Sequence, residues 1–237
     1  MINFENNPYP TITINKEIVL DFQSSEAYKS LRSNIEFCGN DIKVIAITSS
    51  LPNEGKSFVS FNLAVSMVEA GKKVLFIDAD MRKSVLNTRY SMSKSNGGLA
   101  YYLAGKQPLE EIIHETNIRK FDIIPTGAVP PNPTELLGLK RLPDAIALLR
   151  ERYDYIIIDT PPLGSVIDSA IITKHCDGVA VVMAAKETSR KVAEHVLNQL
   201  RRTECPILGV ILNKVDIDDK FYGKYYGKYY GKYYGKY

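Results

Sequence analysis

A short loop that ends in Gly55, Lys56 and Ser57 carries the first chemical signal of the sequence. It follows an apolar run at 44–48 and precedes a helical pattern over 56–70. Backbone N–H groups at the start of a helix favour anions, and a glycine-lysine-serine sequence between a strand and a helix is typical of a Walker A loop. The alternative is a chance occurrence at a helix start. We predict that nucleotide phosphates bind to Asn53, Glu54, Gly55, Lys56, Ser57 and Phe58.

Lys56 and Ser57 have distinct predicted roles within this loop. The Lys56 ammonium would reach the β and γ phosphates of the nucleotide, and the Ser57 hydroxyl would bind Mg²⁺. Ser50 stands where most such loops have their first glycine. We therefore interpret the loop as a deviant form of the Walker A motif.

Carboxylates close two further apolar runs. Asp159 ends one run at the Walker B position, from which a carboxylate holds the magnesium hydration shell. Asp78 and Asp80 end another run and are separated by one residue, so in an extended chain both side chains point the same way. Two carboxylates beside Mg·ATP can bind the metal and accept a proton from an incoming hydroxyl, although a helix cap or surface charge is the alternative reading. We predict Lys56, Asp78 and Asp80 as catalytic residues, and Ser57, Asp80 and Asp159 as magnesium ligands.

Asn213 follows the last apolar run and begins the sequence Asn213-Lys214-Val215-Asp216. This sequence matches the Asn-Lys-x-Asp pattern that reads guanine in GTPases. Asp159, however, is followed by Thr-Pro-Pro rather than by the Asp-x-x-Gly switch of those proteins. We predict that Asn213 contacts the nucleotide base, and we favour adenine.

Short apolar runs alternate with helical patterns along most of the chain. Continuous apolar runs suit strands that are covered on both faces, and their alternation with helices predicts an α/β fold with a doubly wound, mainly parallel sheet of the P-loop NTPase type. Ligands in such sheets bind beyond the carboxyl ends of the strands, where the polar residues above fall. We predict strands at 44–48, 74–78, 155–159, 179–183 and 207–212, and helices at 56–70, 141–152, 165–175 and 189–202.

Two regions lie outside this alternation. Residues from about 24 to 38 read as a helix capped by Ser24 or Ser25. Residues 220–237 contain eight tyrosines and five lysines, with glycine at every fourth position from Gly223, a spacing that opposes helix formation. We expect residues 1–219 to form one P-loop domain and residues 220–237 to form a flexible tyrosine-rich tail.

The positive charge of the chain belongs to this tail. The whole sequence has 30 basic and 27 acidic residues; without the five tail lysines, 25 basic residues remain against 27 acidic ones. Residues 1–219, the body of the protein, therefore have a net charge of −2, which argues against nucleic acid as a partner. The 3 cysteines show no metal-binding spacing, and neither a signal peptide nor an apolar run of about 20 residues is found. We therefore expect a cytoplasmic protein that reaches a membrane only through a partner.

The combined motifs resemble those of the bacterial tyrosine kinases of capsular and extracellular polysaccharide synthesis. The resemblance covers nearly the whole chain from about Ser24. It rests on the deviant loop, on Asp78-x-Asp80-x-Arg82, on Asp159 with its Thr-Pro-Pro, on residues 127–137 and on the tyrosine-rich terminus. It implies that residues 1–219 are a kinase domain, which uses ATP and Mg²⁺ to phosphorylate tyrosines of its own tail and thereby regulates polysaccharide synthesis and export.

The resemblance also implies partners. In the form of the family that lacks membrane spans, a separate membrane protein, the chain-length adaptor, activates the kinase and would recruit it to the inner face of the plasma membrane; a phosphotyrosine phosphatase would reverse the reaction. The family's subunits assemble in rings through a Glu-x-x-Arg-x-x-Arg helix, which here reads Glu26, Lys29 and Arg32. These residues share a helix face, but lysine lacks the bidentate fork of arginine, and a solvated face is the alternative.

The tail tyrosines are the predicted phosphoacceptors. A phenol has a pKa of about 10, so it needs a nearby base, for which Asp80 is the first choice and Asp78 the second. A flexible tail of this length spans roughly 25 Å, which is enough to reach a neighbouring subunit, and we predict phosphorylation in trans. The predicted acceptors are Tyr222, Tyr225, Tyr226, Tyr229, Tyr230, Tyr233, Tyr234 and Tyr237.

Two other functional classes compete with the kinase. ATPase switches of the chromosome-partitioning and division-site class share the deviant Walker architecture, but they usually carry a signature lysine early in the phosphate loop, and residues 49–52 contain none. A binding module is the second alternative, since lysines among aromatic residues can contact single-stranded nucleic acid or anionic lipid. The slightly acidic body offers no matching basic groove, and we favour the kinase.

Overall fold

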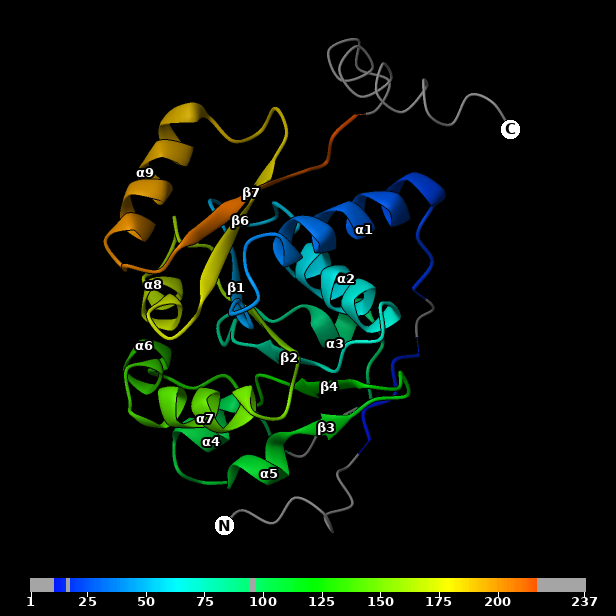
Figure 1. The fold of residues 1–237 in the computed structure, drawn as a ribbon. Coiled ribbons are helices and arrows are strands. Elements are labelled where there is room, and N and C mark those ends of the chain that lie inside the picture. The colour runs from blue at the N-terminus through cyan, green and yellow to red at the C-terminus, as the bar shows by residue number, and fades with distance from the viewer. Residues whose placement is uncertain (1–10, 16–17, 94–96, 217–237) are drawn as a thin grey trace.

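A seven-stranded sheet forms the centre of the molecule in the computed structural model, which describes residues 11–15, 18–93 and 97–216 (Figure 1). The strand order is β3-β4-β2-β5-β1-β6-β7, and only the β3–β4 pair is antiparallel. The predicted α/β fold with a mainly parallel sheet is therefore confirmed. The strands are β1 (Val44–Ser49), β2 (Val74–Asp78), β3 (His114–Glu115), β4 (Phe121–Ile124), β5 (Tyr155–Asp159), β6 (Gly178–Ala184) and β7 (Ile207–Asn213).

The two additional strands, β3 and β4, extend one edge of the sheet. Asp122 interrupts the apolar run of β4, and β3 has only two residues, which explains why continuous apolar character did not reveal either strand. Asp122 is accommodated because the Tyr153 hydroxyl donates a hydrogen bond to its carboxylate at 2.7 Å. Beside β3, Ile12 forms an isolated parallel bridge with Thr116.

Helices cover both faces of the sheet, as Figure 1 shows. Alternate residues of the strands pack into two layers: Phe76 and Ile157 face the helices α1, α2 and α3, whereas Leu75 and Ile156 face α4 to α8. The helix α9 packs on β6 beside that second layer. The helices are α1 (Phe22–Glu36), α2 (Lys56–Glu69), α3 (Leu86–Arg89), α4 (Leu99–Leu103), α5 (Leu109–Ile112), α6 (Pro133–Leu137), α7 (Arg141–Arg150), α8 (Asp168–Thr173) and α9 (Arg190–Arg201).

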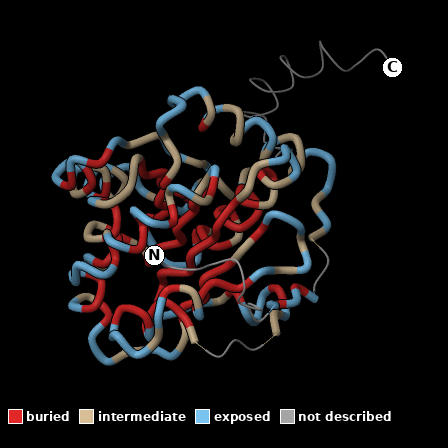
Figure 2. Tube along the Cα trace, turned by 60° about the horizontal axis from the view of Figure 1, so that its bottom comes forward, coloured by how far each residue is buried: buried red, intermediate tan, exposed pale blue. Residues whose placement is uncertain are grey.

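Burial follows this layered arrangement. Every residue of β1, β2 and β6 is buried, and the buried segments run through the middle of the molecule while exposed residues lie on the outer helices and turns (Figure 2). Across the described ranges, we find no helix with the length and apolar character that crossing a bilayer requires.

The first helix begins earlier than its predicted cap. Helix α1 starts at Phe22, and its N-cap is Asp21 rather than Ser24 or Ser25, because the Asp21 carboxylate accepts a hydrogen bond from the Ser24 backbone N–H at 2.8 Å. Aspartate caps a helix as well as serine does, so the sequence offered several equivalent caps within five residues. The predicted tail, residues 220–237, lies outside the described residues.

The strand order brings the ends of β1, β2 and β5 together. Strand β5 lies between the other two, and Asp78 of β2 pairs in register with Asp159 of β5. Because the three strands are parallel, their carboxyl ends meet at one edge of the sheet, and the loop after β1 leads directly into α2.

Asp177 lies at the opposite edge of the sheet, where the strands begin, and links the start of β1 to Arg150 of α7. Its carboxylate accepts hydrogen bonds from the backbone N–H groups of Lys43 at 2.9 Å and Val44 at 2.8 Å, and it pairs with Arg150. Partial burial favours the protonated acid, but the bonds from Val44, Arg150 and Lys43 outweigh that effect and hold the pKa of Asp177 below its usual value.

Replacing Asp177 with asparagine should therefore destabilise the fold at neutral pH. A lowered carboxyl pKa stabilises the folded state above the unfolded-state pKa, and this contribution is lost as the pH falls through the folded-state pKa. We expect Asp177→Asn to lower the free energy of unfolding by about 1–3 kcal/mol at pH 7, and by less near pH 3, in urea titrations. Asp41→Asn, at an exposed turn position, is the control. A difference that grows on acidification would contradict this assignment.

Candidate active site

The loop between β1 and α2 has the backbone conformation of an anion-binding turn. Asn53 and Gly55 adopt positive φ angles of 66° and 91°, and α2 begins immediately afterwards at Lys56. A side chain at position 55 would collide with the Asn213 amide, which donates a hydrogen bond to the Glu54 carbonyl at 2.9 Å. Glycine is therefore required here both by the backbone angle and by the close approach of β7.

Lys56 lies at the centre of a buried cluster of charges. Its ammonium is 3.0 Å from Asp80 Oδ2, 3.4 Å from Asp159 Oδ2 and 3.1 Å from Ser57 Oγ. The side chains of Lys56, Asp80 and Asp159 are only 8%, 7% and 1% exposed. Burial alone would lower the pKa of Lys56, but the charges of Asp159 and Asp80 outweigh it and raise the pKa above its usual value.

Asp78 lies beside this cluster and supports the turn that carries Asp80. Its carboxylate accepts hydrogen bonds from the Asp80 backbone N–H at 3.2 Å and from the Ser84 hydroxyl. Asp80 in turn accepts a bond from the Lys83 backbone N–H at 3.1 Å. Burial, reinforced by the charge of Asp159, raises the pKa of Asp78 to about 7.

The structure thus places the predicted catalytic and metal-binding residues at one edge of the sheet. The carboxylate and hydroxyl oxygens of Ser57, Asp80 and Asp159 are the hard ligands that Mg²⁺ takes, and the Lys56 ammonium shows that the space between the two carboxylates accepts a cation. Within the described ranges, no group of three His, Cys, Asp or Glu side chains is arranged to hold a metal. Such a donor set fits a magnesium ion that is held jointly with nucleotide phosphates.

Three contacts of the site were not predicted from the sequence. The Ser60 hydroxyl donates to Asp159 at 3.2 Å, and its position one turn after Lys56 on α2 could have indicated this. Arg82 forms a two-pronged contact with Asp168, through Nε at 2.7 Å and Nη2 at 3.1 Å. The Glu54 side chain meets Thr188. The Arg82–Asp168 and Glu54–Thr188 contacts join residues that are far apart in sequence, and no local sequence pattern predicts them.

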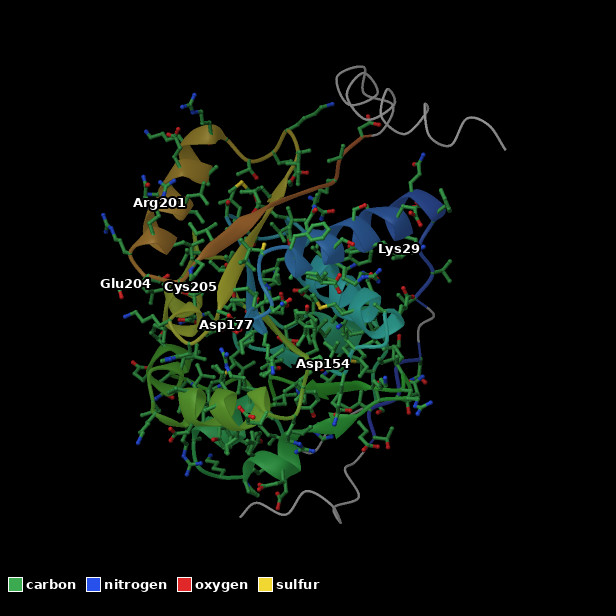
Figure 3. All side chains as sticks on the ribbon, in the orientation of Figure 1. Lys29, Asp154, Asp177, Arg201, Glu204 and Cys205 are labelled. Atoms are coloured by element: carbon green, nitrogen blue, oxygen red, sulfur yellow. The ribbon has the colours of Figure 1, made fainter. Side chains whose placement is uncertain are left out.

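Other predicted site residues have local partners. The Phe58 ring packs edge-on against Tyr28 of α1, with ring centres 6.5 Å apart, while its N–H donates to Gly55 within the helix start. Lys29 lies on α1 (Figure 3) and pairs with Glu26 at 2.7 Å. Arg32 donates to the Ser66 carbonyl at 2.6 Å. The eight predicted phosphoacceptors, from Tyr222 to Tyr237, lie outside the described residues.

Known proteins resemble this chain in sequence and in fold. Tyrosine-protein kinase CpsD of Streptococcus agalactiae is 42% identical to the chain over 201 residues, which cover 85% of this chain and 88% of that protein. The chain belongs to the bacterial tyrosine-protein kinases. The kinase domain of the Escherichia coli tyrosine kinase ETK matches the structure of our kinase with a TM-score of 0.76 at 34% identity, over 81% of this chain and 75% of that one.

A matching family model and a second solved structure agree with this assignment. The AAA domain family matches residues 42–207 of the kinase, in keeping with a nucleotide-binding P-loop domain. The septum site-determining protein MinD of Pyrococcus horikoshii, solved with Mg-ADP, matches with a TM-score of 0.65 at 29% identity, over 75% of this chain and 72% of that one. The division-site class that competed with the kinase reading is thus a structural relative, but a less similar one.

The buried charge cluster predicts how the kinase responds to loss of Lys56. In Lys56→Met, two buried carboxylates lose their ammonium partner, and the pKa of Asp159, already raised by burial, rises further. A raised carboxyl pKa costs stability above the unfolded-state pKa, and the cost disappears as the pH falls below it. We expect the variant to be about 3–5 kcal/mol less stable than wild type at pH 7, with a smaller gap near pH 4.5.

Urea denaturation at the two pH values measures this effect. Lys174→Met, which removes an exposed lysine just after α8, is the matched control and should leave the midpoint nearly unchanged at both. Equal midpoints for Lys56→Met and wild type at pH 7 would show that the ammonium does not stabilise the carboxylates.

Proposed function

We propose that this kinase phosphorylates the tyrosine cluster of its own tail in trans, with ATP and Mg²⁺, and that this reaction regulates capsular or extracellular polysaccharide synthesis and export. The observation that carries the proposal is the convergence of Lys56, Asp80 and Asp159 at the start of α2. A lysine that can meet phosphates and a carboxylate that can accept a proton lie within one hydrogen-bonded cluster.

Nucleotide binding is assigned to the phosphate loop. The backbone N–H groups of residues 53–58 and the Lys56 ammonium are proposed to hold the phosphates. Ser57, Asp80 and Asp159 would hold the magnesium ion, which when bound neutralises phosphate charge as the phosphoryl group is transferred. Asn213 donates one amide N–H to the Glu54 carbonyl, which holds it beside the phosphate loop and leaves its Oδ1 as an acceptor for the amino group of adenine.

Asp80 is proposed as the base that activates the tyrosine. The phenol proton would pass to the Asp80 carboxylate as the phenol oxygen attacks the γ phosphorus; the bond from that phosphorus to the bridging oxygen breaks, and ADP leaves. Asp80 is favoured because its Oδ2 lies 3.0 Å from the Lys56 ammonium, the group proposed to hold the phosphates, whereas the oxygens of Asp78 accept bonds from Ser84 and from the Asp80 N–H and support the turn. Asp78, with its pKa raised to about 7, is the second candidate.

The tail is proposed to act on a neighbouring subunit. Strand β7 ends at Asn213, beside the phosphate loop, so residues 220–237 follow soon after the carboxyl edge of the sheet. The sequence predicts a flexible chain there, for which 18 residues at about 5–6 Å × √n correspond to roughly 25 Å, enough to reach another subunit. Glu26, Lys29 and Arg32 on α1 are proposed to contact that neighbour in a ring.

Further partners follow from the same proposal. A membrane adaptor would activate the kinase and hold it at the inner face of the plasma membrane, and a phosphotyrosine phosphatase would remove the modification. Nucleic acid is not among the proposed partners, because the body has fewer basic than acidic residues.

A mixing experiment tests the reaction in trans. Lys56→Met chains, which retain the tail tyrosines, are incubated with ATP, Mg²⁺ and an active chain whose eight tail tyrosines are replaced by phenylalanine. We expect anti-phosphotyrosine signal on the Lys56→Met chains only in the mixture, since neither chain alone combines an active site with acceptors. A signal confined to unmixed wild-type chains would mean that each tail reacts with its own site.

Substitution of the two acidic residues tests the choice of base. Asp80→Asn should lower kcat by about 10²–10⁴-fold, because the proton acceptor is removed, whereas Asp78→Asn should lower it less. Asp154→Asn, at the amino end of β5 (Figure 3), is the control and should keep kcat. A greater loss for Asp78→Asn would reverse the two roles.

A further inference from the structure

The side chain of Glu54 occupies an unusual position inside the phosphate loop. Glu54 is only 2% exposed, although it is an acidic residue within a loop that binds anions. One carboxylate oxygen accepts a hydrogen bond from the Leu51 backbone N–H at 2.8 Å, and the other accepts one from the Thr188 hydroxyl. Both oxygens therefore have protein partners, as a buried carboxylate requires.

The bond to Leu51 shapes the loop itself. A carboxylate that reaches back three residues to a backbone N–H closes a tight turn, as the glutamate of a capping box does at a helix start. The turn encloses Asn53, whose φ of 66° is unfavourable for a residue with a side chain. Glu54 thus offsets the cost of the backbone conformation that presents the loop to phosphates.

The bond to Thr188 joins the loop to a distant segment. Thr188 lies in the turn between β6 and α9, and its neighbour Glu187 pairs with Lys214 at 3.1 Å. Lys214 follows Asn213, whose amide holds the Glu54 carbonyl at 2.9 Å. The contacts form a closed circuit that runs through the phosphate loop, the β6–α9 turn and the end of β7.

We propose that Glu54 is a positioning residue that presets the nucleotide site by fixing the phosphate loop against the β6–α9 turn. The Glu54 carboxylate accepts a bond from Leu51 of the phosphate loop, and the Glu54 carbonyl accepts one from Asn213, the residue assigned to the nucleotide base. Losing its side-chain contacts should therefore weaken nucleotide binding while leaving the transfer step intact. The inference rests on the proposed function only in that nucleotide occupies this loop.

Four variants and two readouts test the proposal. Glu54→Ala removes both contacts, Glu54→Gln removes the charge, Thr188→Val removes the hydroxyl and Thr188→Ser restores it. For each full-length chain, calorimetry gives the Kd for ADP with Mg²⁺, and tail phosphorylation gives KM for ATP and kcat. Glu194→Ala, which alters an exposed glutamate of α9, is the matched control.

We expect Glu54→Ala and Thr188→Val to raise the Kd for ADP and the KM for ATP by about tenfold, with kcat within about threefold of wild type. Glu54→Gln should show a smaller increase, and Thr188→Ser and Glu194→Ala should bind like wild type. Thermal midpoints without nucleotide identify any variant that fails to fold, in which case Thr188→Val and its serine rescue decide the question.

Three results would overturn the proposal. They are wild-type Kd values in every variant, a fall in kcat without a change in Kd, and weak binding by Glu54→Ala alongside normal binding by Thr188→Val. Because ADP binding is measured without a kinase reaction, a chain that binds nucleotide as described but phosphorylates no tyrosine would contradict the proposed function and leave this inference standing.

Discussion

The pairing of the Lys56 ammonium with the carboxylates of Asp80 and Asp159 is the interaction on which the site depends. Each of these groups is almost fully buried. Because an isolated buried charge is costly, the ammonium and the two carboxylates stabilise one another. The cluster therefore fixes the start of α2, the turn after β2 and the end of β5 relative to one another. The proposed nucleotide and magnesium chemistry uses the same charged groups.

The sheet explains how this cluster forms from distant parts of the chain. Strand β5 lies between β1 and β2, and Asp159 of β5 stands in register with Asp78 of β2 and with Ile47 of β1 at the carboxyl edge. Helices on both faces exclude water from the strands up to that edge, where the first polar side chains appear. The carboxylates at this edge are themselves buried, and burial raises the pKa of Asp78 to about 7.

Five of the strands and the convergence of the site residues could be predicted from the sequence, for physical reasons. Continuous apolar runs identified five strands, and because parallel strands end at one edge, Asp80 and Asp159 could be expected near Lys56. Strand β4 was missed because Asp122 breaks its apolar run and depends on Tyr153, a partner from another element. The contacts of Glu54 with Thr188 and of Arg82 with Asp168 could not be predicted either, since each joins polar residues whose proximity only the folded chain defines.

A crystal structure of the chain with Mg²⁺ and a non-hydrolysable ATP analogue would show whether Lys56, Asp80 and Asp159 act together on the nucleotide. We expect the Lys56 ammonium to contact the β and γ phosphates, and the carboxylates of Asp80 and Asp159 to face the γ phosphate and the metal. A structure in which nucleotide is bound while Lys56 still bridges the two carboxylates, or in which Asp80 turns away from the γ phosphate, would contradict this expectation.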